Sequence, residues 1–123
     1  MLYTRKEFET IVAESLDSLP EEFGQKIENV SVEVEEWPTR EDLKTPGVAP
    51  GGSLFGLYWG VPKTNRAFYA NALPDKIIIF AGPIISYFGY DRQILKEKIR
   101  ETVLHEIAHH FGMTDEEIKK ARR

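Results

Sequence analysis

One helical segment near the C-terminus of this 123-residue chain constrains its fold more than any other feature. Asp91 is a suitable N-cap, the helical pattern continues to His110 or Phe111, and Gly112 is placed to end the helix. At about 100° per residue, its apolar residues share one side, namely Val103, Leu104, Ile107, Ala108 and Phe111, and its polar ones share an arc, namely Thr102, His105, Glu106 and His109. Arg100 is an exception, because it lies on the apolar side. We therefore expect one face of this helix to pack and the other to carry chemistry.

The rest of the chain predicts three more helices and a small sheet. The helical segments are a capped helix from Thr4 to about Ser18, a short turn at Pro20–Phe23 that Gly24 limits, and a terminal helix from Thr114 to Lys120. The strands are Val30–Glu35, which alternates in polarity, Leu54–Val61, a short one around Phe68–Ala70, and Lys76–Phe80, which ends at Gly82-Pro83. The continuous apolar run at Lys76–Phe80 predicts a strand that is covered on both faces.

Length and composition limit the classes of protein to which the chain can belong. A chain of 123 residues with 41% hydrophobic content can bury one core, so we expect a single domain over residues 1–123. The formal net charge of -4 argues against a nucleic-acid partner. The first seven residues are too charged for a signal peptide, and no segment approaches the roughly 18 apolar residues of a membrane span, so a cytoplasmic protein is expected. Residues 45–53 predict a loop, either a plain connection or a lid.

All three histidines lie in one stretch of the long helix, His105-Glu106-Ile107-Ala108-His109-His110. Residues four apart share a helix face, so the imidazoles of His105 and His109 can reach one zinc ion. The carboxylate of Glu106 is displaced around the helix and can act on water as a general base without binding the metal. Because the chain has no cysteine, any metal must use histidine and carboxylate ligands.

A catalytic zinc normally takes three protein ligands, and Asp115 is the best candidate for the third. Gly112 would let the chain leave the helix in a left-handed turn and fold back toward the ion. The alternatives are plain. His105 and His109 could be ordinary helix histidines, Asp115 could simply favour the start of the terminal helix, and His110, turned about 100° from His109, is expected not to bind the metal.

The pattern His105-Glu106-x-x-His109-x-x-Gly112-x-x-Asp115 resembles that of the zincin metallopeptidases, with Asp in place of the third His of the metzincin type. More closely, the chain resembles the small bacterial zincin-like family sometimes called minimal metalloproteases. The likeness extends through Leu54–Tyr58, Gly60–Pro62, Pro74–Phe80, Gly82-Pro83 and Glu101–His105. It implies an α/β fold of the α+β kind, in which a short mixed β-sheet packs against an active-site helix, with N-terminal and C-terminal helices. By the same analogy, Lys76–Phe80 would offer an edge to an extended peptide.

The chain departs from the resemblance in two respects. We expect neither the methionine turn that metzincins have downstream of the helix, because only residues up to Arg123 follow it, nor a downstream domain that supplies a side chain for the oxyanion. Tyr58, Tyr69, Tyr87 and Arg66 are candidates for the second role, and the sequence does not select among them.

Three functions are compatible with the sequence. The first is a zinc-dependent peptidase that acts on peptides or unfolded protein segments. The second is a metal-binding or interaction module on a zincin scaffold with little turnover, although such a module needs no general base at Glu106. The third is the small bacterial zinc endoribonuclease family of ribosomal RNA maturation, whose motif resembles this one but has Gly at the position of Glu106 and His at that of Asp115.

Overall fold

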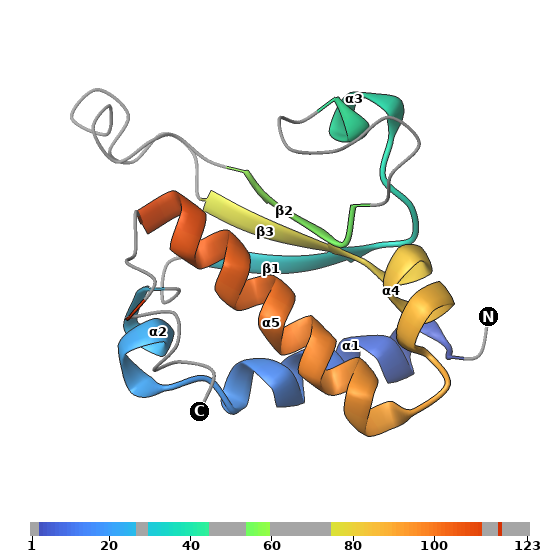
Figure 1. Cartoon of the computed structure of the whole chain (residues 1–123), viewed down its shortest axis with the longest axis horizontal. Coiled ribbons are helices and arrows are strands. Elements are labelled where there is room, and N and C mark those ends of the chain that lie inside the picture. The colour runs from blue at the N-terminus through green and yellow to red at the C-terminus, as the bar shows by residue number, and fades with distance from the viewer. Residues whose placement is uncertain (1–2, 27–29, 45–53, 60–74, 112–115, 117–123) are drawn as a thin grey trace.

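The computed structural model describes residues 3–26, 30–44, 54–59, 75–111 and 116 (Figure 1). In chain order the elements are α1 (Arg5–Asp17), α2 (Glu21–Lys26), β1 (Val30–Glu35), α3 (Arg40–Leu43), β2 (Gly56–Trp59), β3 (Asp75–Phe80), α4 (Ala81–Phe88) and α5 (Arg92–Phe111). The fold is thus of the predicted α+β kind. The loop at 45–53, the strand at 68–70 and the helix at 114–120 were predicted for segments that lie outside the described residues. No described helix is long and apolar enough to cross a membrane.

The strands form a mixed sheet of order β1-β3-β2, in which β1 is parallel and β2 antiparallel to β3. Ile77 and Ile79 on one face of β3 are fully buried, and Ile78 and Phe80 on the other face are at most 6% exposed, so the prediction of a strand covered on both faces is confirmed. The expectation that Lys76–Phe80 offers an edge was wrong. This segment pairs with β1 on one side and with β2 on the other, so it is the central strand, and among the described strands β1 and β2 form the edges.

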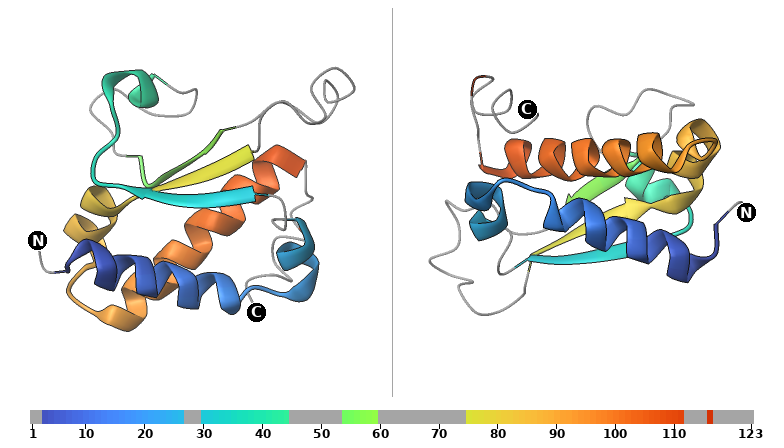
Figure 2. Two further views of the ribbon diagram at one scale, coloured as in Figure 1. Left: turned by 180° about the vertical axis from the view of Figure 1, so that it is seen from behind. Right: turned by 90° about the horizontal axis from the view of Figure 1, so that it is seen from below.

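The helices α1 and α5 lie on one face of this sheet and form the main core with it (Figure 2). The core contains Phe8, Ile11 and Val12 of α1, Val34 of β1, Ile77 and Ile79 of β3, and Leu95, Ile99, Val103, Leu104 and Ile107 of α5. The expected packing face of α5 is therefore confirmed, and its opposite, polar face remains at the surface of this core.

Arg100, the exception on the packing side of α5, has a specific partner. Its Nη2 donates a hydrogen bond of 3.4 Å to the carbonyl oxygen of Ser18. Ser18 is the C-cap of α1, and a positive charge at this position is stabilised by the negative end of the helix dipole. Arg100 thus helps to hold the end of α1 against α5.

Two helices, α4 and α3, were not predicted from the sequence. Gly82-Pro83 does follow the end of β3, but both residues lie in the first turn of α4, where proline is tolerated because its missing N–H would have no partner in the helix. The short helix α3 was not predicted, although Thr39 and Asp42 form a capping box there.

The turn expected to stop at Gly24 instead continues as α2 to Lys26. A Cβ at Gly24 would meet nothing within 4 Å, so no close contact requires glycine at this position. A single glycine costs a helix only about 1 kcal/mol, which packing elsewhere can offset.

The predicted N-cap of α5 is confirmed and gives a first testable expectation. Oδ1 of Asp91 accepts hydrogen bonds from the backbone N–H groups of Gln93, at 2.8 Å, and Ile94, at 3.2 Å. We expect Asp91→Ala to lower the free energy of unfolding by about 1 kcal/mol in urea denaturation, because these groups lose their acceptor. Asp91→Ser keeps an acceptor and should retain most of that stability; equal losses in both variants would contradict the capping role.

Candidate functional site

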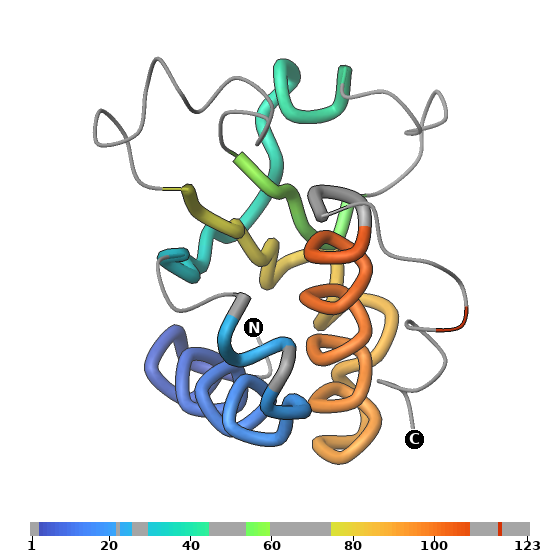
Figure 3. Tube along the Cα trace, turned by 90° about the vertical axis from the view of Figure 1, so that its left-hand side faces the viewer, coloured from blue at the N-terminus to red at the C-terminus, as the bar shows by residue number. Residues whose placement is uncertain are grey.

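The strand β2, an edge of the described sheet, lies beside α5 (Figure 3). A Cβ at Gly56 would lie 2.5 Å from Cγ2 of Thr102, and two residues further along β2 the backbone of Tyr58 hydrogen bonds to Glu106. Two strand residues span about 6.6 Å and four helix residues about 6 Å, so strand and helix advance in step. The face of α5 that carries the predicted motif is therefore placed along a strand edge.

The backbone groups of Tyr58 point away from the rest of the sheet. The N–H of Phe80 donates to the carbonyl oxygen of Phe55 at 2.9 Å, which makes Phe55 and Phe80 a hydrogen-bonded pair in line with the β2–β3 register. Because such pairs alternate in an antiparallel ladder, Leu57 and Trp59 also bond to β3, and Tyr58 faces outward. Its outward N–H is the one that meets the carboxylate of Glu106.

Glu106 has the electrostatic character of a general base. Burial raises the pKa of its carboxyl group from 4.5 to about 7, and the hydrogen bond from the Tyr58 backbone opposes part of that rise. A catalytic acid or base works best when its pKa lies near the working pH. Among the groups that the structure describes, Glu106 is therefore well suited to exchange protons near neutrality.

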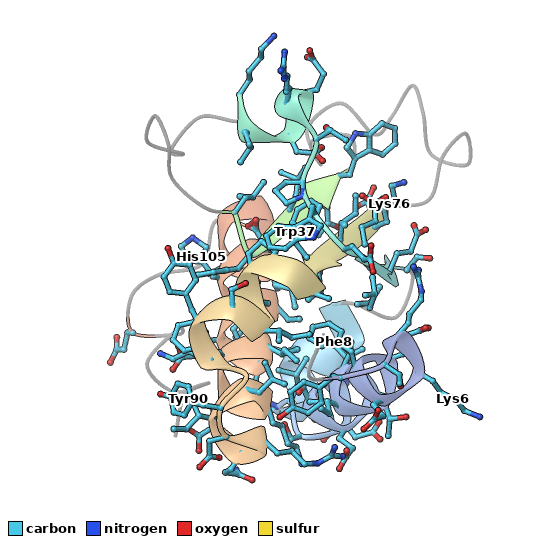
Figure 4. The ribbon with its side chains drawn as sticks, turned by 90° about the vertical axis from the view of Figure 1, so that its right-hand side faces the viewer. Lys6, Phe8, Trp37, Lys76, Tyr90 and His105 are labelled. Carbon is cyan, nitrogen blue, oxygen red and sulfur yellow. The ribbon has the colours of Figure 1, made fainter. Side chains whose placement is uncertain are left out.

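The predicted metal ligands are described to different extents. His105 is exposed on the outer side of α5, away from Phe8 in the core (Figure 4). The helix backbone continues through position 109, one turn further on, but the side chain of His109 and all of Asp115 lie outside the described part of the chain. The described residues by themselves contain no group of three possible metal ligands.

One polar pair beneath the site was not predicted. Oη of Tyr58 donates a hydrogen bond of 2.6 Å to Oδ2 of Asp75, whose residue is only 4% exposed. Tyr58 lies opposite Ile77, and Asp75 lies two residues before Ile77, so both side chains occupy the sheet face that α5 covers. Tyr58 thus contacts β3 through its side chain and Glu106 through its backbone. The sequence shows only that Asp75 begins a mainly apolar strand, and this does not identify Tyr58 as its partner.

Of the four residues considered for the oxyanion, the structure describes two. The hydroxyl of Tyr58 donates its hydrogen bond to Asp75. Tyr87 packs against Phe55, and 58% of the surface of Tyr87 is exposed. Tyr69 and Arg66 lie outside the described residues. The described geometry therefore does not assign an oxyanion donor.

Comparisons with known proteins agree with this architecture. A family model described as zincin-like metallopeptidase matches residues 27–123. The structure is similar to that of a conserved hypothetical protein from Thermus thermophilus, with a TM-score of 0.57 and 26% sequence identity, over 89% of this chain and 94% of that one. A search of curated proteins finds no significant match. The family match covers most of the chain, including the strand edge and the helix that form the site, and the chain therefore belongs to the zincin-like metallopeptidase family.

Proposed function

We propose that this protein is a zinc-dependent peptidase in which Glu106 is the general base and His105, His109 and Asp115 hold the metal. The observation that carries the proposal is the carboxylate of Glu106 at the outward edge of β2, with its pKa raised to about 7. The family match supports a metallopeptidase scaffold. A plain structural glutamate on a helix surface would not need to be desolvated beside a strand edge.

The donor chemistry fits zinc. Two imidazoles and one carboxylate form a common catalytic ligand set for this ion, and His105 lies at the exposed surface of α5. Bound zinc supplies Lewis acidity, which makes water acidic enough to lose a proton near neutral pH. His105 and position 109 are one helical turn apart, as a shared ligand pair requires.

The residues of this chain would divide the work of hydrolysis. Glu106 would take a proton from the attacking water and return it to the leaving amine, which a group with pKa near 7 can do in both directions. The outward backbone groups of Gly56 and the outward carbonyl oxygen of Tyr58 would hold an extended peptide beside β2 by strand addition, while the N–H of Tyr58 stays bonded to Glu106. This mode of binding favours peptides or unfolded protein segments as substrates, because folded proteins rarely present a free extended strand.

Metal binding by single variants tests the proposal. We expect one zinc ion per chain in the parent protein, an affinity reduced more than about 100-fold in His105→Ala, and a smaller reduction in Asp115→Ala, since each loses a donor atom. Metal content by mass spectrometry and cleavage of an unfolded protein such as casein are the two measurements.

His110→Ala is the matched control, because it removes a neighbouring imidazole that is not assigned to the metal. It should keep both zinc and cleavage. If the parent binds no zinc at neutral pH, or if His105→Ala binds it as tightly as the parent, the assignment of the site fails.

A further inference from the structure

Phe55, which precedes β2, forms an aromatic cluster with Tyr87 and Phe88 at the end of α4. The ring of Phe55 packs edge-on against Tyr87, with centroids 5.7 Å apart, and against Phe88, with centroids 5.8 Å apart. Phe55 and Phe88 also pack against the hydrophobic core, whereas Tyr87 is 58% exposed. The cluster therefore has a fixed base of two rings and one ring that is open to solvent.

The strand β2 connects this aromatic cluster to the candidate site. Phe55 precedes Gly56, and β2 continues from there along α5 to the contact between Tyr58 and Glu106. Tyr58 is three positions after Phe55, which corresponds to about 10 Å of extended chain at about 3.3 Å per residue. A peptide added beside β2 advances by the same step, so its side chain near Phe55 belongs to a residue about three positions from the one beside Glu106.

We propose that Tyr87, supported by Phe55, is a specificity subsite that selects a large apolar or aromatic side chain about three residues from the cleaved peptide bond. The inference rests on the proposed function and adds the class of substrate to it. An exposed aromatic ring gains most from an apolar or aromatic partner that stacks on it.

Mapping of cleavage sites in a proteome-derived peptide mixture tests the subsite. The zinc-loaded parent should prefer large apolar residues about three positions from the cleaved bond by about fivefold to tenfold, the effect of one aromatic contact. In Tyr87→Ala this preference should fall below about twofold, while Tyr87→Phe, which keeps the ring, should retain it.

Tyr90→Ala is the matched control, because Tyr90 is 73% exposed on the turn after α4 and belongs to none of the ring pairs of the cluster. It should leave the preference unchanged, and zinc content should be equal in all variants. A profile of Tyr87→Ala that matches that of the parent overturns the subsite while leaving the peptidase function intact.

Binding gives a readout that does not depend on turnover. Capped peptide pools with one fixed Phe, or with Ala at the same position, can be titrated into Glu106→Gln protein and followed by the amide NMR signals of residues 85–88. We expect the Phe pool to shift these signals more than the Ala pool, and Tyr87→Ala to remove the difference. That result supports the subsite even if the parent cleaves nothing, in which case only the hydrolytic function fails; equal shifts with both pools overturn the subsite.

Discussion

Glu106→Gln is expected to reduce peptide cleavage by about 10²-fold to 10⁴-fold while zinc remains bound at one ion per chain. Gln keeps the size of the side chain and an oxygen that can accept the Tyr58 N–H, but it cannot take a proton from water. Parallel measurement of zinc content and of casein cleavage separates the loss of the base from the loss of the metal. Cleavage by the variant at the rate of the parent would remove Glu106 from the mechanism, and absence of cleavage by both would favour a metal-binding module.

The same substitution should stabilise the metal-free protein in a pH-dependent way. Because burial raises the pKa of Glu106 from 4.5 to about 7, the folded state binds the proton more tightly than the unfolded state. Stability is therefore lost as the pH rises from about 4.5 through 7, and the penalty is fully present above that range. At about 1.4 kcal/mol per pKa unit, the rise from 4.5 to about 7 gives a ceiling of about 3–4 kcal/mol, and partial solvent contact of the carboxylate reduces this penalty to about 1–2 kcal/mol.

Urea denaturation in the presence of a chelator checks this expectation. Glu106→Gln should exceed the parent in free energy of unfolding by about 1–2 kcal/mol at pH 8 and by much less at pH 4. Glu97→Gln is a suitable control, because Glu97 is exposed on the same helix and should show no such difference. An equal gain for Glu106→Gln at both pH values would mean that its carboxyl group is not desolvated in the folded state.

Local sequence patterns predicted most helices and strands of this fold, but they did not predict which strands lie next to one another in the sheet. The start of α5 at Asp91 and the capping box of Thr4 and Glu7 depend on residues within one turn, so the sequence contains the whole signal. The run at Lys76–Phe80 correctly indicated burial, but periodicity measures how much of a strand is covered and not which strands lie beside it. The central position of β3 therefore became evident only from the sheet itself.

In the candidate site, too, features that depend on one helix were predicted, and contacts between distant segments were not. Helical spacing predicted that Thr102, His105 and Glu106 share a face, because that depends on one helix alone. The contact of Glu106 with the Tyr58 backbone and the bond from Tyr58 to Asp75 join segments far apart in the chain, and no local pattern encodes them. What the sequence could not supply is the tertiary contact that desolvates the base.

Gly56→Ala should disturb the site by separating β2 from α5. The added methyl group would lie 2.5 Å from Cγ2 of Thr102 and 3.2 Å from the carbonyl oxygen of Ile78, so strand or helix must move. Overpacking of this kind costs about 1–3 kcal/mol of stability, and displacement of β2 also moves the Tyr58 N–H away from Glu106. We expect Gly56→Ala to lower both the free energy of unfolding and the rate of peptide cleavage.

Thr102→Ser is the compensating change, because it removes Cγ2 and keeps the hydroxyl that donates to the carbonyl oxygen of Lys98 at 2.8 Å. In a double-mutant cycle the two substitutions should couple favourably by about 0.5–3 kcal/mol, and the double variant should recover cleavage. Gly24→Ala controls for the general effect of replacing glycine, since its Cβ would meet nothing within 4 Å, and it should be neutral or stabilising. If Gly56→Ala is as stable as the parent, or if Thr102→Ser fails to rescue it, close packing of β2 on α5 does not position the site.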